Sequence, residues 1–309
     1  MTSILKRALN GIFATLVAVG ALEITLVHAQ DKDENEIELT YVEWSTEVAS
    51  TNVIKVVLEE LDYEVNLMPV TAVWMWQAVA NGDADGHVAA WLPTTHEFYW
   101  EVMKDRVENL GPNLVGTKIG LVVPQYATIN SIEELNANAE MFKGKIIGID
   151  PASGLMNKTK QAMGEYELGK FSLVEGSGAS MTAALAKAIK KNEWIVVTGW
   201  TPHWKFSRWK LKYLEDPKGI YKPKDNQKEE HVATIVRKGL KEEMPEVYRV
   251  LNNFCWTHAD MAKVMVWNSE PEADPYQTAK RWVNENRDKV NKWLLGEQIE
   301  NACIIKKEE

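Results

Sequence analysis

The chain has 309 residues, of which 45% are hydrophobic and 26% charged, and this length suits two globular domains of roughly 100 to 150 residues each. Its formal net charge of −9 argues against nucleic acid as a partner, because phosphate backbones are bound by basic surfaces. The chain holds 13 tryptophans against 6 phenylalanines, although tryptophan is a poor choice for simple core filling. Several tryptophans are therefore expected to do more than pack.

The N-terminal 29 residues have the pattern of a secretory signal peptide. Lys6 and Arg7 precede an apolar stretch over residues 11–20, and Val27-His28-Ala29 is similar to a cleavage site. The alternative is an uncleaved membrane anchor, but Glu23 interrupts the stretch, which falls short of the ~20 residues that a span needs. We expect export to the periplasm after cleavage near Ala29, which would leave a mature chain of net charge −9 − (+1) = −10.

Alternating strand and helix patterns follow a disordered linker expected over residues 30–36. The expected elements are a strand over 37–44, a helix over 45–61, a strand over 63–70, a helix over 72–82 and a strand over 86–90. Such a succession predicts a parallel, doubly wound sheet whose ligand crevice lies at the carboxyl ends of the strands.

A second block of the same kind restarts near residue 124, which predicts two α/β lobes. Its last strand is expected over 193–199, and residues 231–239 look like a strand that returns to the first lobe before C-terminal helices. The expected organisation is a first lobe over 37–123, a second lobe over 124–228, and a return to the first lobe over 229–309.

Catalytic and metal-binding motifs are scarce. The sequence has no His-Glu-x-x-His, Gly-x-Ser-x-Gly, Walker or Cys-x-x-Cys motif, and its histidines show no ligand spacing, so we expect no metal and no cofactor. The Gly/Ser-rich turn at 175–180 has two interpretations, an anion site at a helix N-terminus or a plain strand-to-helix connection. Cys255 and Cys303 either form a disulfide in an oxidising compartment or remain free thiols.

Tryptophans recur at the carboxyl ends of the expected strands. Trp44 follows the first strand, Trp91 the third, and Trp200 the strand that ends at residue 199, with Trp204 close behind. The doubly wound rule predicts that they meet at the crevice from both lobes. Trp74 and Trp76 lie two residues apart on a helix, so only one of them can face the crevice.

A box of indole rings suits a quaternary ammonium group. Each ring face attracts a diffuse cation, and the methyl groups of the onium carry no N–H that needs a partner. Three or four faces at roughly 0.5 to 2 kcal/mol each, with methyl burial, could support the ~8 kcal/mol of a micromolar complex. An anionic tail on the ligand could meet Ser45 and Thr46 at a helix start, and His203.

Several long segments, in order from about residue 37 to 260, carry a resemblance to a known family. They are VEWSTEVASTNV, MWQAVANGDADGHVAAWLPTTH, GLVVPQY, GKIIGIDPASGLM, VEGSGASMTAAL, IVVTGWTPHW and LKYLEDP. The chain resembles the glycine betaine-binding proteins of ABC importers, the OpuAC-like family. The resemblance implies a two-lobe periplasmic-binding-protein fold of type II, with hinge-joined lobes that close on a quaternary ammonium held in an aromatic cage and deliver it to a permease.

Carried onto this sequence, the resemblance assigns a cage and its carboxylate contacts. Trp76 and Trp200 match cage walls, and His203 with the amides of Ser45 and Thr46 match carboxylate contacts. Trp44 and Trp91 match cage aromatics of choline-binding relatives, which have an aspartate where Thr46 stands here. The segment ELGKFSLVEGSG lacks a tryptophan that some members have, so the third wall is Trp91, Trp44 or Trp204, and the weaker rim candidates are Tyr126 and Asn157.

We therefore expect an exported, monomeric substrate-binding protein, not an enzyme, that takes up glycine betaine or a related onium. Choline, carnitine, trimethylamine oxide and dimethylsulfoniopropionate are alternative ligands. A sugar-binding protein is a further alternative, but it predicts more Asp, Asn and Arg in the crevice. A hydrolase or lyase using His203 as base would turn over a methylated amine, yet no nucleophile or metal set accompanies His203.

Overall fold

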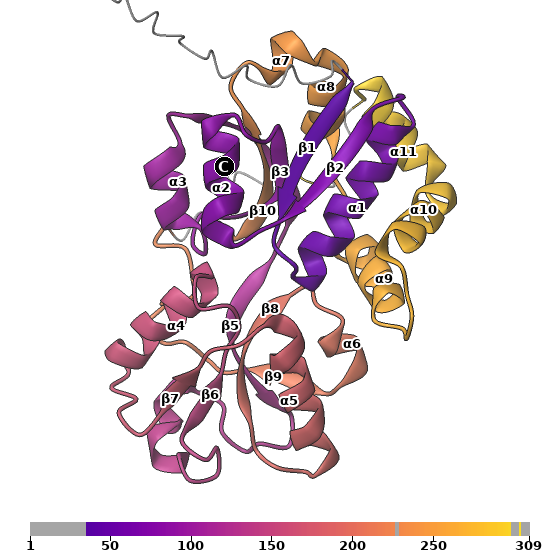
Figure 1. The fold of residues 1–309 in the computed structure, drawn as a ribbon. Coiled ribbons are helices and arrows are strands. Elements are labelled where there is room, and N and C mark those ends of the chain that lie inside the picture. Colours follow the sequence, from indigo (N-terminus) through magenta and orange to yellow (C-terminus); the bar gives the residue numbers. More distant parts are fainter. Residues whose placement is uncertain (1–34, 226–228, 298–302, 304–309) are drawn as a thin grey trace, which may run out of the picture. The chain divides into compact units, whose positions relative to one another are not determined.

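The computed structural model describes residues 35–225, 229–297 and 303 (Figure 1). The expected signal peptide with its cleavage site near Ala29, and most of the expected linker, lie outside the described residues. Within the described part of the chain, no helix combines the length and the apolar character that crossing a membrane requires.

The first five-stranded sheet has the order β2-β1-β3-β10-β4. Its strands are β1 (Glu36–Tyr41), β2 (Glu64–Pro69), β3 (Gly86–Leu92), β4 (Val107–Val115) and β10 (His231–Arg237). β1 pairs in parallel with β2 and β3, whereas β10 runs antiparallel to both β3 and β4. The strand-helix succession predicted a parallel sheet, and the observed sheet is mixed, because β10 arrives from the other sheet and is not constrained by a βαβ crossover.

Helices cover both faces of this sheet, as the strand order requires. The chain steps from β1 to β2 in one direction and from β2 to β3 in the other, so right-handed crossovers put α1 and α2 on opposite faces. α2 lies beside α3, and α1 packs against α9 and α10 (Figure 1). The helices of this lobe are α1 (Ser45–Glu59), α2 (Ala72–Asn81), α3 (Glu97–Met103), α7 (Leu240–Glu243), α8 (Pro245–Asn253), α9 (His258–Asn268), α10 (Pro275–Glu285) and α11 (Arg287–Leu295).

The second sheet has the order β7-β6-β8-β5-β9 and is also mixed. Its elements are β5 (Lys118–Pro124), β6 (Lys145–Ile147), α4 (Gly154–Glu165), β7 (Ser172–Val174), α5 (Gly178–Lys190), β8 (Val196–Thr201), α6 (Lys205–Arg208), β9 (Leu211–Tyr213) and two short 3-10 turns, η1 (Ile132–Glu134) and η2 (Asn136–Asn138). We call each sheet with its helices a lobe. The fold class is as predicted, two α/β units each built on a sheet flanked by helices.

The passage between the sheets differs from the boundary expected after residue 123. β5 pairs with β8 and β9, so the chain changes sheets between Val115 and Lys118.

Strand β4 has no counterpart in the sequence pattern, because Gly111 and Pro112 interrupt its run of strand-forming residues. β4 lies at the edge of its sheet, where a proline and the register shifts seen in its pairing with β10 are tolerated.

A second group of tryptophans belongs to the core of the first lobe. Trp256, Trp282 and Trp293 are each fully buried and pack against one another, and we call them the C-terminal tryptophan cluster. Next to them, Cys255 forms a disulfide with Cys303. The covalent link attaches the last described residue to the segment between α8 and α9.

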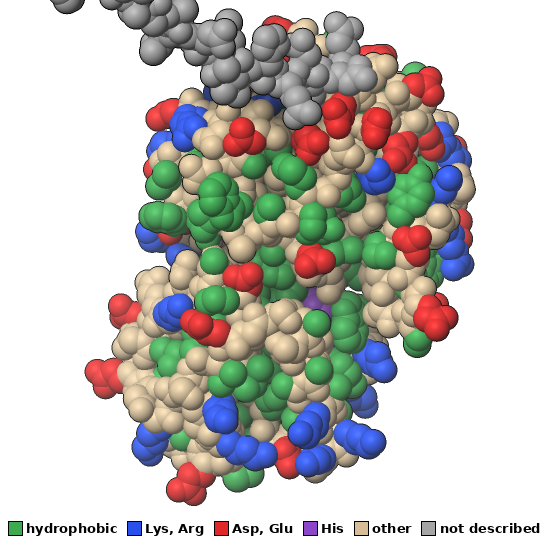
Figure 2. Space-filling view, in the orientation of Figure 1, with side chains coloured by type: hydrophobic (Ala, Val, Ile, Leu, Met, Phe, Trp, Pro, Cys, Tyr) green, Lys and Arg blue, Asp and Glu red, His purple; other side chains and the backbone are tan. Residues whose placement is uncertain are grey.

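Apolar side chains are also exposed on α2 and α3, over which hydrophobic atoms gather in Figure 2. Trp74 and Phe98 are 60% and 70% exposed, and Val102 is exposed beside them. Trp74 is thus a surface residue, although Trp76, two positions further, is buried.

Candidate functional site

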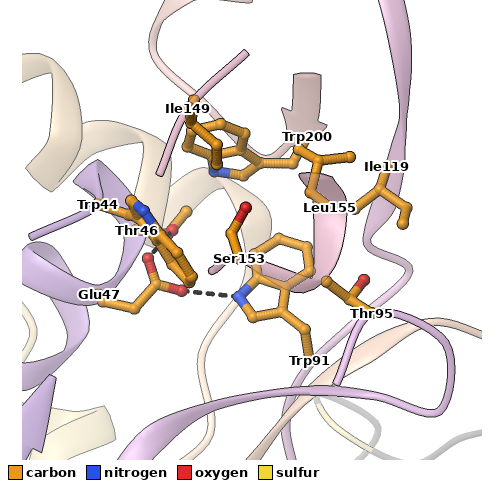
Figure 3. A pocket seen from close by; sticks show the side chains of 10 residues that line it. All are labelled: Trp44, Thr46, Glu47, Trp91, Thr95, Ile119, Ile149, Ser153, Leu155 and Trp200. Atoms are coloured by element: carbon orange, nitrogen blue, oxygen red, sulfur yellow. Dashed lines mark hydrogen bonds between the residues drawn. The ribbon is translucent and has the colours of Figure 1, made fainter. Parts of the chain in front are cut away.

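A cavity of about 290 Å³ of atom-free space, partly open to solvent, is lined by residues of both lobes (Figure 3). We call it the tryptophan pocket. Its lining consists of Trp44, Thr46, Glu47, Trp91, Thr95, Ile119, Ile149, Ser153, Leu155 and Trp200.

Three indoles define the tryptophan pocket. Trp44 and Trp91 come from the first lobe and Trp200 from the second, with exposed fractions of 8%, 3% and 4%. Figure 3 shows their rings grouped around the same space. The structure therefore brings together the three tryptophans that the strand-end pattern singled out.

The local fold explains these positions. β1 ends at Tyr41, three residues earlier than expected, and Trp44 is the extended residue that precedes the first turn of α1. Trp91 lies within β3 and Trp200 within β8, each one residue before its strand ends. Trp200 is paired with Ile119 across the β5–β8 ladder, and both residues line the pocket.

Glu47, which the sequence reasoning missed, is the one titratable residue in this lining. Its side chain is 1% exposed; Oε1 accepts a hydrogen bond from Trp91 Nε1 at 2.7 Å, and Oε2 accepts one from Thr46 Oγ1. Burial raises the pKa of Glu47 to about 7, against the lowering effect of these hydrogen bonds. Glu47 follows Trp44 by three residues at the start of a helix, so both lie on the same helix face. This spacing is the sequence signal from which Glu47 could have been predicted.

A buried pair lies behind Trp200. The His203 ring meets the Trp200 ring edge-on at 4.6 Å, and Lys205 Nζ lies 4.2 Å from the Trp200 ring centroid. His203 Nδ1 accepts a hydrogen bond from the Lys205 amide at 3.1 Å, and its Nε2 has no partner among the described residues. Burial, and secondarily the charge of Lys205, lower the pKa of His203, so its ring is neutral.

Trp76 is not in the lining, in contrast to its predicted role as a cage wall. It is 0% exposed, packs edge-on against His87 at 5.0 Å, and its Nε1 donates to His96 Nδ1 at 3.4 Å. The reason is that α2 turns this position toward the sheet, into the core. His96 Nδ1 also accepts from the Trp91 amide at 3.1 Å, so Trp76 lies under the pocket and supports its wall.

The remaining candidates are dispersed. Ser45 and Trp204 line a separate cavity near the starts of α1 and α5. The Tyr126 hydroxyl donates to the Glu193 carbonyl at 2.8 Å, outside the tryptophan pocket, and Asn157 is exposed on α4. Across residues 35–225, 229–297 and 303, no cluster of three or more His, Cys, Asp or Glu side chains could hold a metal ion.

The lobes contact each other beside the pocket. The Tyr99 hydroxyl donates to the Ala152 carbonyl at 2.5 Å, and Glu97 pairs with Lys158 at 3.3 Å. Gly154, the first residue of α4, lies so close to Thr95 that a Cβ there would come within 1.8 Å of the Thr95 carbonyl oxygen. The absence of a side chain at Gly154 therefore allows the backbones of the two lobes to approach closely at this point.

Residues 35–285 match the family described as the substrate binding domain of ABC-type glycine betaine transport systems. The glycine betaine/carnitine transport binding protein GbuC of Listeria monocytogenes is 45% identical over 169 residues, which are 54% of this chain. The match spans only about half, 54%, of that relative's own length.

Solved structures of glycine betaine- and choline-binding proteins are similar to this chain over more of its length. Lactococcal OpuAC, in a closed conformation complexed with glycine betaine, has 42% identity and a TM-score of 0.78, with 84% of this chain and 99% of that chain covered. An ABC-transporter choline-binding protein in complex with choline has 26% identity and a TM-score of 0.79, over 87% of this chain and 94% of that one.

The expected family is thereby confirmed. Its members are transport binding proteins that act outside the cytoplasm and are not enzymes, so the hydrolase or lyase alternative is set aside. With its two mixed sheets and its pocket of three tryptophans, this chain belongs to the substrate-binding domains of ABC-type glycine betaine transport systems.

Proposed function

We propose that the protein captures glycine betaine, or a closely related methylated onium compound, in the tryptophan pocket and delivers it to the permease of an ABC importer. The observation that carries this proposal is the grouping of Trp44, Trp91 and Trp200, contributed by both lobes, around one small cavity. A ligand that contacts all three rings binds only where the two lobes meet. Its binding energy therefore favours the closed conformer.

The energetics suit a permanently methylated cation. Three indole faces contribute roughly 0.5 to 2 kcal/mol each, and burial of methyl groups adds ~0.8 kcal/mol per carbon. These contributions together approach the ~8 kcal/mol of a micromolar complex. An unmethylated amine would lose the methyl burial against the three indole faces.

Two polar groups on the second lobe are candidates for the ligand carboxylate. Trp200 Nε1 and His203 Nε2 are buried and have no hydrogen-bond partner among the described residues. A buried donor without a partner costs free energy, which a carboxylate would recover. Thr46 lines the pocket, so its amide remains a candidate, whereas Ser45 faces the separate cavity and is a weaker one.

The choice among onium ligands follows from the same groups. Glycine betaine and its analogues with a carboxylate use both the indoles and the carboxylate contacts. Choline, carnitine, trimethylamine oxide and dimethylsulfoniopropionate are the alternative ligands, and choline has no carboxylate that could use the carboxylate contacts. We expect the mature protein to act as a periplasmic monomer after removal of a signal peptide that ends near Ala29.

A thermal-shift panel tests the proposal. A ligand at 100 times its dissociation constant stabilises the protein by ~2.7 kcal/mol, so glycine betaine should raise Tm by several degrees. Glycine, which keeps the carboxylate and lacks the methyl groups, is the matched control and should have no effect. A shift with glycine or with a sugar, and none with any onium, would refute the proposal.

A further inference from the structure

We infer that Glu47 is the counter-ion of the onium in the tryptophan pocket, and that it loses its proton to solvent when the onium binds. This inference rests on the proposed function, since it requires an onium ligand. It adds a charge-bearing residue to a site otherwise lined by indole rings, aliphatic side chains and hydroxyl groups.

Position is the first argument. Glu47 lines the same cavity as the three tryptophans, and its Oε1 is hydrogen-bonded to the indole of one of them, Trp91. An onium in contact with that ring therefore lies close to a carboxyl group. At such separations a full negative charge attracts the cation more strongly than a ring face does.

Charge balance is the second argument. No Lys, Arg or His side chain of the described residues pairs with Glu47, and its only side-chain partners are the two neutral donors Thr46 and Trp91. A carboxylate that is 1% exposed without a cation is strongly disfavoured. Burial accordingly raises the pKa of Glu47 to about 7 in the ligand-free protein. A bound onium supplies the missing cation and favours the ionised form.

Other titratable groups adjoin the pocket lining and have to be considered. They are Glu43 before Trp44, His96 and Glu230 beside the β3–α3 turn, Asp150 before α4, and His203 and Lys205 behind Trp200. None of these groups contributes to the raised pKa of Glu47. Burial lowers the pKa of His96 to about 3, so His96 stays neutral in the relevant range. Lys205 is the remaining rival, because burial lowers its pKa as well.

The sign of the effect follows from linkage. The onium binds preferentially to the protein with ionised Glu47. Below the pKa of ligand-free Glu47 most of the protein carries the proton and must lose it before the onium binds, so affinity falls as the pH falls. With a pKa of about 7, affinity should be about tenfold weaker at about pH 6 than at about pH 8. Above that range affinity should be constant.

Isothermal titration calorimetry with glycine betaine, repeated in buffers of different ionisation enthalpy, measures both consequences. The wild type should release close to one proton per ligand at about pH 6 and close to none at about pH 8.5. Glu47→Gln keeps an acceptor for the Trp91 indole but carries no charge. It should bind at least about a hundredfold more weakly than the wild type at about pH 8, with no pH dependence and no proton release.

The Lys205→Met variant separates the two titratable candidates and should keep the full pH dependence. The inference is overturned if the wild type binds glycine betaine without proton release at about pH 6, or if only Lys205→Met abolishes the pH dependence. Unchanged affinity in Glu47→Gln would equally overturn it and would leave Glu47 a purely structural partner of Trp91. Absence of binding at every pH would instead refute the proposed function itself.

Discussion

The protein contains two groups of three tryptophans that do different things. In the C-terminal tryptophan cluster, Trp282 stacks on Trp293 at 5.9 Å and meets Trp256 edge-on at 5.6 Å. In the tryptophan pocket, none of the ring pairs between described residues joins two of the three indoles. In the first group the indole faces and edges pack against one another, whereas in the second no indole covers the face of another.

The difference teaches that the number of tryptophans does not identify a site. Both groups are buried, and a ring that is 3% or 4% exposed looks much like one that is 0% exposed. What separates them is whether another ring already covers the face. Because the three pocket rings come from both lobes, a ligand that covered their faces would contact both lobes at once.

The largest effect is expected for the C-terminal tryptophan cluster. Trp282→Ala removes a fully buried side chain, and such substitutions cost about 3–5 kcal/mol of unfolding free energy. Chemical denaturation should show this loss, while calorimetry on the folded protein should find the wild-type affinity for glycine betaine. Trp74→Ala, at a position that is 60% exposed, is the control and should change stability by less than about 0.5 kcal/mol. Equal losses in both variants would contradict the assignment.

Trp200→Ala should instead weaken the binding of glycine betaine. Loss of one cation–π face and of its apolar contact should cost about 3 kcal/mol of binding free energy, or more than a hundredfold in Kd. Titration calorimetry checks this value, with Trp74→Ala again as the control. A Kd within a factor of three of the wild type would mean that Trp200 is not a wall of the site.

Gly154→Ala tests whether ligand binding needs the contact between lobes. Its Cβ would lie 1.8 Å from the Thr95 carbonyl oxygen, a clash that opposes closure and should cost about 2 kcal/mol, or roughly thirtyfold, in affinity. Gly164→Ala on the same helix is the matched control, because a Cβ there meets no atom within 4 Å. Wild-type affinity in Gly154→Ala would show that the ligand binds without this contact.

Trp91→Phe should have the smallest effect. The substitution keeps an aromatic face and removes the N–H that donates to Glu47 Oε1 at 2.7 Å, so affinity should fall by about 1 kcal/mol, roughly fivefold. Trp44→Phe is the comparison, since the Trp44 indole N–H makes no hydrogen bond to another described side chain. Calorimetry on both variants measures the difference. Equal losses would indicate that the Glu47–Trp91 hydrogen bond contributes nothing to binding.

The sequence predicted the fold class and the family well, because strand and helix periodicities are local signals that recur in both lobes. It predicted β4 poorly, because Gly111 and Pro112 mask a strand that only its edge position permits. It also predicted the change of sheet too late, since the apolar pattern of β5 is the same in either sheet.

The tryptophan pocket was predicted in part for similar reasons. Trp44, Trp91 and Trp200 follow from the rule that strand ends share one edge of a sheet. Trp76 did not follow that rule and was assigned by resemblance, yet the orientation of α2 buries it under His96. Glu47 escaped notice because a glutamate near a helix start is ordinarily solvated and favourable there. Its burial depends on long-range packing against Trp91.

The most direct test is a crystal structure of the complex with glycine betaine. The account predicts a quaternary nitrogen within about 6 Å of the ring centroids of Trp44, Trp91 and Trp200, with Glu47 beside it. A ligand bound instead in the cavity lined by Ser45 and Trp204, away from these three rings, would contradict it.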